Sequence, residues 1–207
     1  MTGSIAIIAA LLVPLIGVLG IVGARHKPNL RETVTLVTAT CLFIQVASLL
    51  TPVLSGARPS VTLLEVLPGL SIAFEVEPLG LIFALVASLL WIVTSVYAIG
   101  YMRGHHEKNQ TRFYAYFAVA LSSTMGIAFA GNMFTLFIFY EVLTLSTYPL
   151  VTHSGTAAAK KGGRTYFGIL IGTSIAFQLL AVIITYVTVG TLDFTQGGIL
   201  AGKASDV

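Results

Sequence analysis

One charged side chain lies inside a long apolar segment of this sequence, and its chemistry is that of proton transfer. Glu141 is the ninth residue of the apolar run 133–151, so it would sit near the middle of a bilayer that this run crosses. A charge at that depth costs about 2.5–3.5 kcal/mol on insertion scales, so an intramembrane carboxyl marks a functional site by default. Hydrocarbon disfavours the charged form, which lets such a carboxyl take up and release protons. The first hypothesis is therefore a proton site inside a membrane.

Polar residues at helical spacing extend from this carboxyl towards one end of the run. Thr144 and Tyr148 stand at i+3 and i+7 from Glu141, which places the three on one stripe of a helix. Pro149 leaves one backbone carbonyl free a turn earlier, and His153 follows the end of the run. This order of polar groups favours a water-assisted proton route that ends at Glu141.

A structural role for the same carboxyl is the alternative. Buried polar groups usually find hydrogen-bond partners, and a neutral carboxylic acid can serve that purpose. Glutamine would do so without an ionisable group, so proton transfer is the favoured interpretation of Glu141. Ser122 and Ser123, on the preceding apolar run, can extend the polar path, and structural hydrogen bonds explain them equally well.

Composition defines the elements that must hold these side chains. Charged residues make up 9% and hydrophobic residues 56% of the sequence, far from the roughly 25% charged residues of soluble domains. A helix that crosses the hydrocarbon needs about 20 apolar residues. Runs this continuous exclude the alternation of a β-barrel. We therefore expect an all-α polytopic membrane protein with six transmembrane helices, at 4–23, 33–51, 79–100, 113–130, 133–151 and 166–189.

Basic residues predict the orientation of these helices. Segments 25–32, 102–112 and 152–165 each carry three Lys or Arg residues, whereas the segments at the other ends of the helices carry only Arg58 and Lys203. The positive-inside rule places the three basic segments in the cytoplasm and both termini on the extracytoplasmic side. No basic residue precedes the first run, so we expect a transmembrane helix there and not a cleaved signal peptide.

The segment between the second and third helices has a pattern of its own. Residues 70–76 alternate apolar with small or acidic side chains, and Leu67-Pro68-Gly69-Leu70 suits a type II turn. This predicts a short extracytoplasmic β-hairpin, with an irregular loop as the alternative. The chain then divides into helices 1–2 (1–54), the loop with the hairpin (55–78), helices 3–6 (79–189) and an extracytoplasmic tail (190–207).

The sequence contains no motif for a phosphate-binding, nucleophilic or metal-binding site. There is no glycine-rich phosphate loop, no nucleophile motif and no Cys or His cluster with metal-ligand spacing. We therefore expect no cofactor, no metal site and no nucleic-acid partner. The single cysteine excludes a disulfide framework.

Three segments carry a resemblance to a known family. EPLGLIFALVASLLWIVTSVYAIGYMRG (77–104), TRFYAYFAVALSSTMGIAFAGNMFTLFIFYEVLTLSTYPLVTH (111–153) and GTLDF (190–194) resemble the proton-pumping antiporter family. That family includes the large subunits of Mrp-type multisubunit cation/proton antiporters, antiporter-like subunits of respiratory complex I and related membrane hydrogenases. The stretch FYEVLTLSTYPLVTH is most similar to the Mrp D-type branch. The resemblance implies that Glu141 is the essential proton-pathway glutamate of the fifth helix.

The same resemblance implies that a partner is missing. Family members continue well beyond a sixth helix, and a lysine on their seventh helix pairs with the fifth-helix glutamate. This sequence has no counterpart of that lysine, and Lys160 and Lys161 cannot replace it because we expect both in a loop. Another polypeptide would then supply the missing helices and the cation.

These observations converge on a transport subunit. We expect a proton-translocating subunit, or the N-terminal portion of one, in a multisubunit antiporter of a prokaryotic inner membrane, exchanging protons for Na⁺ or another monovalent cation. One alternative is an antiporter-like membrane subunit of an NADH:quinone oxidoreductase or a membrane hydrogenase. The chain has no redox ligand, so any enzyme chemistry would belong to its partners. The other alternative is a non-conducting fragment or assembly module.

Overall fold

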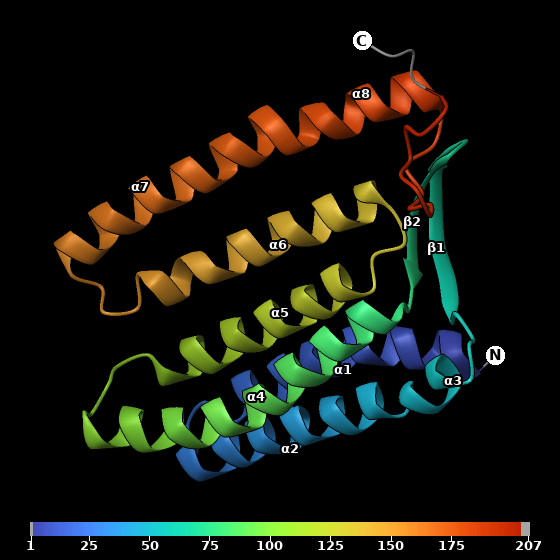
Figure 1. The fold of residues 1–207 in the computed structure, drawn as a ribbon. Coiled ribbons are helices and arrows are strands. Elements are labelled where there is room, and N and C mark those ends of the chain that lie inside the picture. Colours follow the sequence, from blue (N-terminus) through green and yellow to red (C-terminus); the bar gives the residue numbers. More distant parts are fainter. Residues whose placement is uncertain (1, 204–207) are drawn as a thin grey trace.

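Helices and one small sheet make up the computed structural model, which describes residues 2–203 (Figure 1). Along the chain the elements are α1 (Thr2–Gly23), α2 (Pro28–Ala47), α3 (Leu50–Leu54), β1 (Ser60–Leu67), β2 (Leu70–Glu75), α4 (Pro78–Gly104), α5 (Gln110–Ala128), α6 (Met133–Val151), α7 (Ala157–Thr173), η1 (Ser174–Leu179) and α8 (Leu180–Val189).

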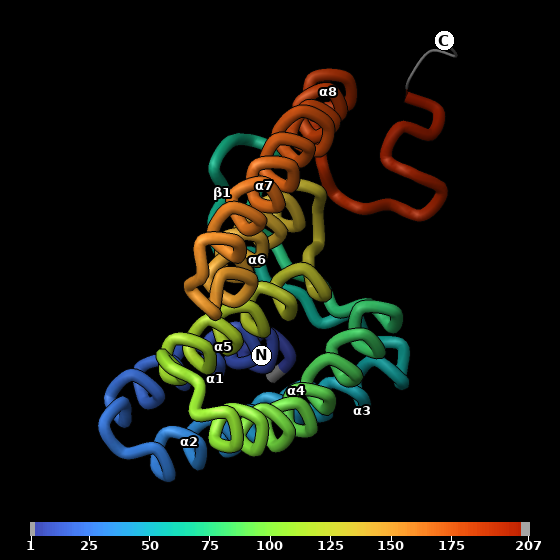
Figure 2. Tube along the Cα trace, turned by 90° about the vertical axis from the view of Figure 1, so that its left-hand side faces the viewer, coloured from blue at the N-terminus to red at the C-terminus, as the bar shows by residue number. Residues whose placement is uncertain are grey.

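The helices form a packed bundle with an open side. Helices α1, α2, α4 and α5 pack on one another around buried side chains such as Leu42, Trp91 and Met125. Helix α6 packs on α5, and the long rod α7–η1–α8 lies beyond α6, away from the bundle (Figures 1 and 2). Only 11% of an 18-residue apolar window in the span Ala157–Val189 is buried, compared with 39% of such a window in Gly3–Gly23. The outer helices therefore leave a wide apolar surface uncovered.

Five of the six expected spans are confirmed by length and composition. They are Gly3–Gly23, Pro28–Leu54, Pro78–Gly104, Met133–Val151 and Ala157–Val189. The sixth, expected at 113–130, forms α5, but Gln110, Arg112 and the hydroxyls of residues 122–124 make this helix less apolar than the others. Helix α5 contacts both α1 and α6 and is the helix whose side chains are most fully enclosed. A mostly helical membrane chain is thus confirmed. Five of the six expected spans are confirmed, and the count of six is not.

Several helices extend into the basic segments that we expected to be loops. Lys160 and Lys161 lie on α7, so their expected place in a loop is wrong. The hydroxyl of Thr156 caps this helix by accepting from the backbone N–H of Ala159 at 3.1 Å. The first three helical residues are alanines, the best helix formers, so the helix begins before its lysines.

The predicted hairpin sequence forms a two-stranded antiparallel sheet. Strands β1 and β2 pair from Ser60↔Glu75 to Leu67↔Leu70. Gly69 has a φ of +79°, the value that the third residue of a type II turn needs. Of the alternating apolar residues, Phe74 and Val76 are fully buried, whereas the side chains of β1 are largely exposed. The period of two therefore identified the face that packs on the helices.

The sheet holds the loops at this end of the molecule together. The backbone of β2 pairs with the α5–α6 connection through Glu75 N–H to Phe129 O at 2.8 Å and Gly131 N–H to Ala73 O at 2.9 Å. The first residue of α6 in turn bonds to the segment after α8, with Met133 N–H donating to Leu192 O at 3.0 Å. The Ser4 hydroxyl donates to the carbonyl of Ser60, so the start of α1 lies at the same end.

Asn132 fixes the start of α6 against this sheet. Its Oδ1 accepts from the backbone N–H of Thr135 at 2.8 Å, which caps the helix, and its Nδ2 donates to the carbonyl of Ser71 at 2.9 Å. The residue is almost completely buried. Because α6 carries Glu141, this contact sets the height of the carboxyl relative to the sheet.

Gly69→Ala should destabilise the chain, because alanine is strained at a positive φ and its Cβ would meet the carbonyl oxygen of Gly190. Gly56→Ala is the matched control, since Gly56 has a φ of +89° but open space around it. Thermal unfolding followed by circular dichroism in detergent should show a larger loss of Tm for Gly69→Ala. Equal losses in the two variants would mean that the contact with Gly190 has no effect.

Candidate functional site

The side chain of Glu141 lies midway along α6 and is partly buried. Its Oε1 atom is enclosed, and no hydrogen-bond partner reaches it among residues 2–203. Buried polar atoms in folded proteins nearly always have a partner, so an enclosed carboxyl oxygen without one needs an explanation beyond packing. A group that exchanges protons with water or with another side chain provides that explanation.

The predicted stripe continues from Glu141 along α6. Thr144 is buried one turn away, and Tyr148 lies a turn further at the interface with α7. The ring of Tyr148 packs on that of Phe167 with 5.2 Å between the ring centroids. Gly163 of α7 lies against Tyr148 and Thr152, and its lack of a side chain lets the two helices approach here. The structure therefore places Thr144 and Tyr148 between Glu141 and the α6–α7 connection.

An open pocket of about 690 Å³ lies at that end of α6. Tyr148, Thr152 and His153 line one side of it, and residues of the α4–α5 connection and of α7 line the other. Polar access from outside thus reaches Tyr148, which is seven residues from Glu141 on the same helix.

His153 lines this pocket just beyond the end of α6. Its ring meets the edge of Phe113 at a centroid distance of 5.5 Å, and its carbonyl accepts from Arg112 at 3.1 Å. Neither ring nitrogen has a hydrogen-bond partner within the described part of the chain. Burial, and to a smaller extent the charge of Arg112, lower the pKa of His153 below its usual range. The imidazole is therefore neutral near pH 7 and able to accept a proton.

Ser122 and Ser123 are placed away from this stripe. The Ser122 hydroxyl donates to the carbonyl of Leu11 in α1 at 2.7 Å, and that of Ser123 donates to Val119 in its own helix at 3.0 Å. Both hydroxyl protons are therefore engaged within the α1–α5 side of the bundle. These bonds match the structural role that the sequence left open for them.

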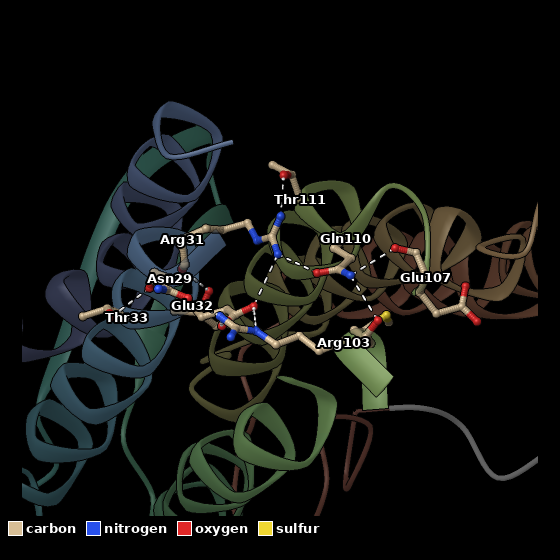
Figure 3. Close-up of polar contacts among 10 residues, drawn as sticks. Asn29, Arg31, Glu32, Thr33, Arg103, Glu107, Gln110 and Thr111 are labelled. Atoms are coloured by element: carbon tan, nitrogen blue, oxygen red, sulfur yellow. Dashed lines mark hydrogen bonds and ion pairs between the residues drawn. The ribbon is translucent and has the colours of Figure 1, made fainter. Parts of the chain in front are cut away.

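A buried charged cluster at the same end of the molecule as the pocket has no counterpart among the predicted site residues (Figure 3). Arg31 and Glu32 are each about 5% exposed. Glu32 accepts from Arg103 through Nε at 3.0 Å and also through Nη2, and Arg31 Nη2 lies 3.5 Å from Glu32 Oε1. The available signal in the sequence was Glu32, an acidic residue within a basic segment, but its partner Arg103 lies 71 residues away.

Neutral groups complete this cluster. Arg31 donates to Gln110 Oε1 at 2.6 Å and to Thr111 Oγ1 at 3.3 Å, and its guanidinium lies 5.3 Å from the centroid of the Tyr114 ring. The start of α2, the end of α4 and the start of α5 are joined in this way (Figure 3). Because Glu32 pairs with both Arg103 and Arg31, the cluster holds these helices together, in contrast to the free oxygen of Glu141.

Comparison with known sequences confirms the resemblance. Residues 68–114 match the family model for the N-terminus of chain 5 of NADH-ubiquinone oxidoreductase (complex I). NADH-quinone oxidoreductase subunit N of Desulforudis audaxviator is 28% identical over 140 residues, covering 67% of this chain and 27% of that protein. The putative antiporter subunit mnhA2 of Staphylococcus aureus is 25% identical over 186 residues, covering 89% and 22%. The chain thus spans about a quarter of the length of these relatives.

Solved structures share the fold. A chain of the membrane-bound sulfane sulfur reductase, an archaeal respiratory membrane complex, superimposes with a TM-score of 0.74 at 22% identity, over 89% of this chain and 28% of that one. A chain of the Mrp complex from Dietzia superimposes with a TM-score of 0.70 at 20% identity, over 89% and 35%. The described helices therefore have the arrangement found in one part of larger membrane subunits.

Glu32→Ala should destabilise the bundle, because it leaves the buried guanidinium of Arg31 without its carboxylate. Removing one partner of a buried ion pair costs up to roughly 3–5 kcal/mol. Glu65→Ala, which removes an exposed carboxylate on β1, is the control and should change little. Chemical unfolding of the detergent-solubilised protein measures both changes, and similar stabilities for the two variants would contradict a stabilising role of the charged cluster.

His153→Gln should flatten the pH dependence of stability in mildly acidic solution. The folded state holds His153 below its usual pKa, so below about pH 6.5 the unfolded chain binds a proton that the folded chain does not. Stability of the parent protein should therefore fall as the pH decreases through this range, and fall less in the variant. Unfolding curves at a series of pH values test this, with His106→Gln in the exposed connection as the control. Parallel curves for parent and His153→Gln would contradict it.

Proposed function

We propose that this chain is a proton-translocating subunit, or the N-terminal portion of one, in a multisubunit monovalent cation/proton antiporter, and that Glu141 carries the proton. The observation behind this proposal is an enclosed carboxyl oxygen without a partner, midway along a helix able to cross a membrane. The similarity to antiporter and complex I subunits supports it.

Protons reach the carboxyl from the pocket at the end of α6. His153 in its wall is neutral and accepts a proton, Tyr148 lines the same pocket, and Thr144 stands one turn from Glu141. Hydroxyl groups spaced along one face orient waters between these positions, and such a file conducts protons without a continuous pore. Ser122 and Ser123 remain at the margin of this route, since their hydroxyls are bonded elsewhere.

Charge determines the proposed orientation. Arg31 comes from one basic segment and Arg103 and Arg112 from another, yet all three lie at the end of the bundle where α2 begins and α4 ends. That end faces the cytoplasm under the positive-inside rule. The hairpin and the segment after α8 then lie on the extracytoplasmic side of a prokaryotic inner membrane, as do both termini.

The proposed partners are further membrane subunits and a lysine close to Glu141. The relatives continue far beyond the part that this chain matches, and the faces of α6, α7 and α8 are largely uncovered. Lys160 lines the pocket beside Tyr148, at the end of α6 and not at its middle, so it does not serve Glu141. Helices that pack on the uncovered side would bring the required cation.

A membrane subunit of a redox-driven complex is the second candidate. The family model that matches residues 68–114 is named for complex I, and the 28% identical relative is a subunit of the bacterial quinone oxidoreductase. The proton chemistry of Glu141 would be the same, and redox centres would belong to other subunits. Purification of the chain with its native partners separates the two: small antiporter subunits favour the first function, and iron–sulfur or flavin proteins favour the second.

Glu141→Gln should abolish cation/proton exchange by the assembled complex, because an amide occupies the same volume but carries no exchangeable acid proton. We expect a fall of about a hundredfold or more, the range over which a positioned acid or base acts. Dye-quenching in inverted membrane vesicles measures the exchange. Glu65→Gln, the same change on the exposed strand β1, should leave it at the parent rate.

Assembly must be followed in the same preparations. The Glu141→Gln complex should elute in size-exclusion chromatography like the parent, and Glu141→Asp should retain part of the exchange. Parent rates in an assembled Glu141→Gln complex would exclude this carboxyl as the proton carrier.

A further inference from the structure

The pocket at the end of α6 carries a concentration of positive charge. Lys108, Arg112, Lys160 and Arg164 all line it, and Glu107 is the one carboxylate in its wall. The basic pocket, as we call it, therefore has a formal charge of +3 before any contribution from histidine. Like charges in a shared cavity repel one another, and an anion bound among them would relieve that repulsion.

Within the part of the chain that the structure describes, Lys108, Lys160 and Arg164 are free to bind a ligand, and Arg112 keeps most of its N–H donors free. The ion pairs found among residues 2–203 join Glu32 to Arg31 and Arg103, and none involves the basic pocket. Arg112 donates one hydrogen bond, to the carbonyl of His153, and no side-chain hydrogen bond occupies Lys108, Lys160 or Arg164 in the described chain. Donors that neither pair with a carboxylate nor bond to the backbone remain available to an external acceptor.

Three elements bring the cations together. Lys108 precedes α5 and Arg112 lies in its first turn, while Lys160 and Arg164 stand four residues apart on one face of α7. Lys161, the neighbour of Lys160, does not line the pocket. The capped N-terminus of α7 adds the positive partial charge of its free N–H groups. Several independent sources of positive potential thus converge on one volume.

Exposed apolar side chains on the helices that line the basic pocket indicate what kind of anion it takes. Val151 is the last residue of α6, and Tyr166 and Ile169 follow Arg164 on α7; they are 47%, 43% and 60% exposed. The volume of about 690 Å³ accommodates a phosphate headgroup with its polar substituent. Basic pockets at the ends of membrane helices, next to exposed apolar surface, match an anionic headgroup that continues into acyl chains.

We propose that the basic pocket is a binding site for an anionic phospholipid, with Lys160 and Arg164 holding the phosphate and the acyl chains lying along α6 and α7. The site depends on the charges and the apolar flank described here and does not require proton transfer by Glu141. It would tie the α4–α5 connection to α7, which otherwise contacts mainly α6 and η1.

Native mass spectrometry of the full chain, purified in a neutral detergent with its accompanying subunits, tests this proposal. Dioleoylphosphatidylglycerol should bind with an affinity at least about tenfold higher than in Lys160→Gln/Arg164→Gln, because each lost hydrogen bond to a charged group weakens binding. Lys27→Gln/Lys161→Gln removes the same charge at the same end but outside the pocket, and it should bind like the parent. Dioleoylphosphatidylcholine should not bind at a comparable level.

Three outcomes would overturn the lipid site. Equal weakening in the two double variants would show a general attraction to the basic surface. Displacement of the lipid by millimolar inorganic phosphate would show that the pocket takes a free anion. Binding of dioleoylphosphatidylcholine with the same affinity as dioleoylphosphatidylglycerol would show that the negative charge of the lipid is not recognised.

Discussion

The cost of placing a charge in an environment with few water molecules determines how this molecule is arranged. At Arg31 and Glu32 that cost is offset by their contacts. Glu32 pairs with both Arg31 and Arg103, and Arg31 also donates to neutral groups, so the buried cluster holds three helices together. Glu141 is different, because its enclosed oxygen has no partner among residues 2–203. A paired cluster is stable and has no reason to exchange protons, whereas a lone carboxyl exchanges them readily. The same constraint thus makes the cluster around Glu32 a structural contact between helices and leaves the carboxyl of Glu141 able to exchange protons.

The position of Glu141 depends on contacts at both ends of α6. Asn132 caps the helix and bonds to β2, so the sheet fixes one end. At the other end, the packing of Tyr148 on Phe167 and the hydrogen bond from Arg112 to the carbonyl of His153 tie the helix to α7 and α5. The buried residues of α6 are Thr135, Thr144 and Ser146, so the rest of the helix, including Glu141, is only partly covered and can meet a partner or water.

Local features of the sequence predicted the parts of the structure that depend on local physics. Apolar length identified five spans, and the pair Pro68-Gly69 located the turn of the sheet, because both signals act within a few residues. The helical start of α7 was missed because its lysines suggested a loop, although the alanines before them favour a helix. The bonds from Arg103 to Glu32 and from Ser122 to Leu11 join residues 71 and 111 positions apart, and no periodicity in the sequence reports them.

The boundary between the packed and open sides of the molecule explains why a glutamate is placed on α6. On one side α5 and the bundle exclude water and fix the helix, and on the other α7–η1–α8 leaves most of its surface free. A carboxyl inside the bundle would need permanent partners, as Glu32 does, and one facing lipid would have none. On the boundary helix, the proposed route from the basic pocket reaches it from one direction and an approaching subunit can reach it from another. A proton carrier needs this arrangement, because it must exchange with two different neighbours without being permanently bonded to either.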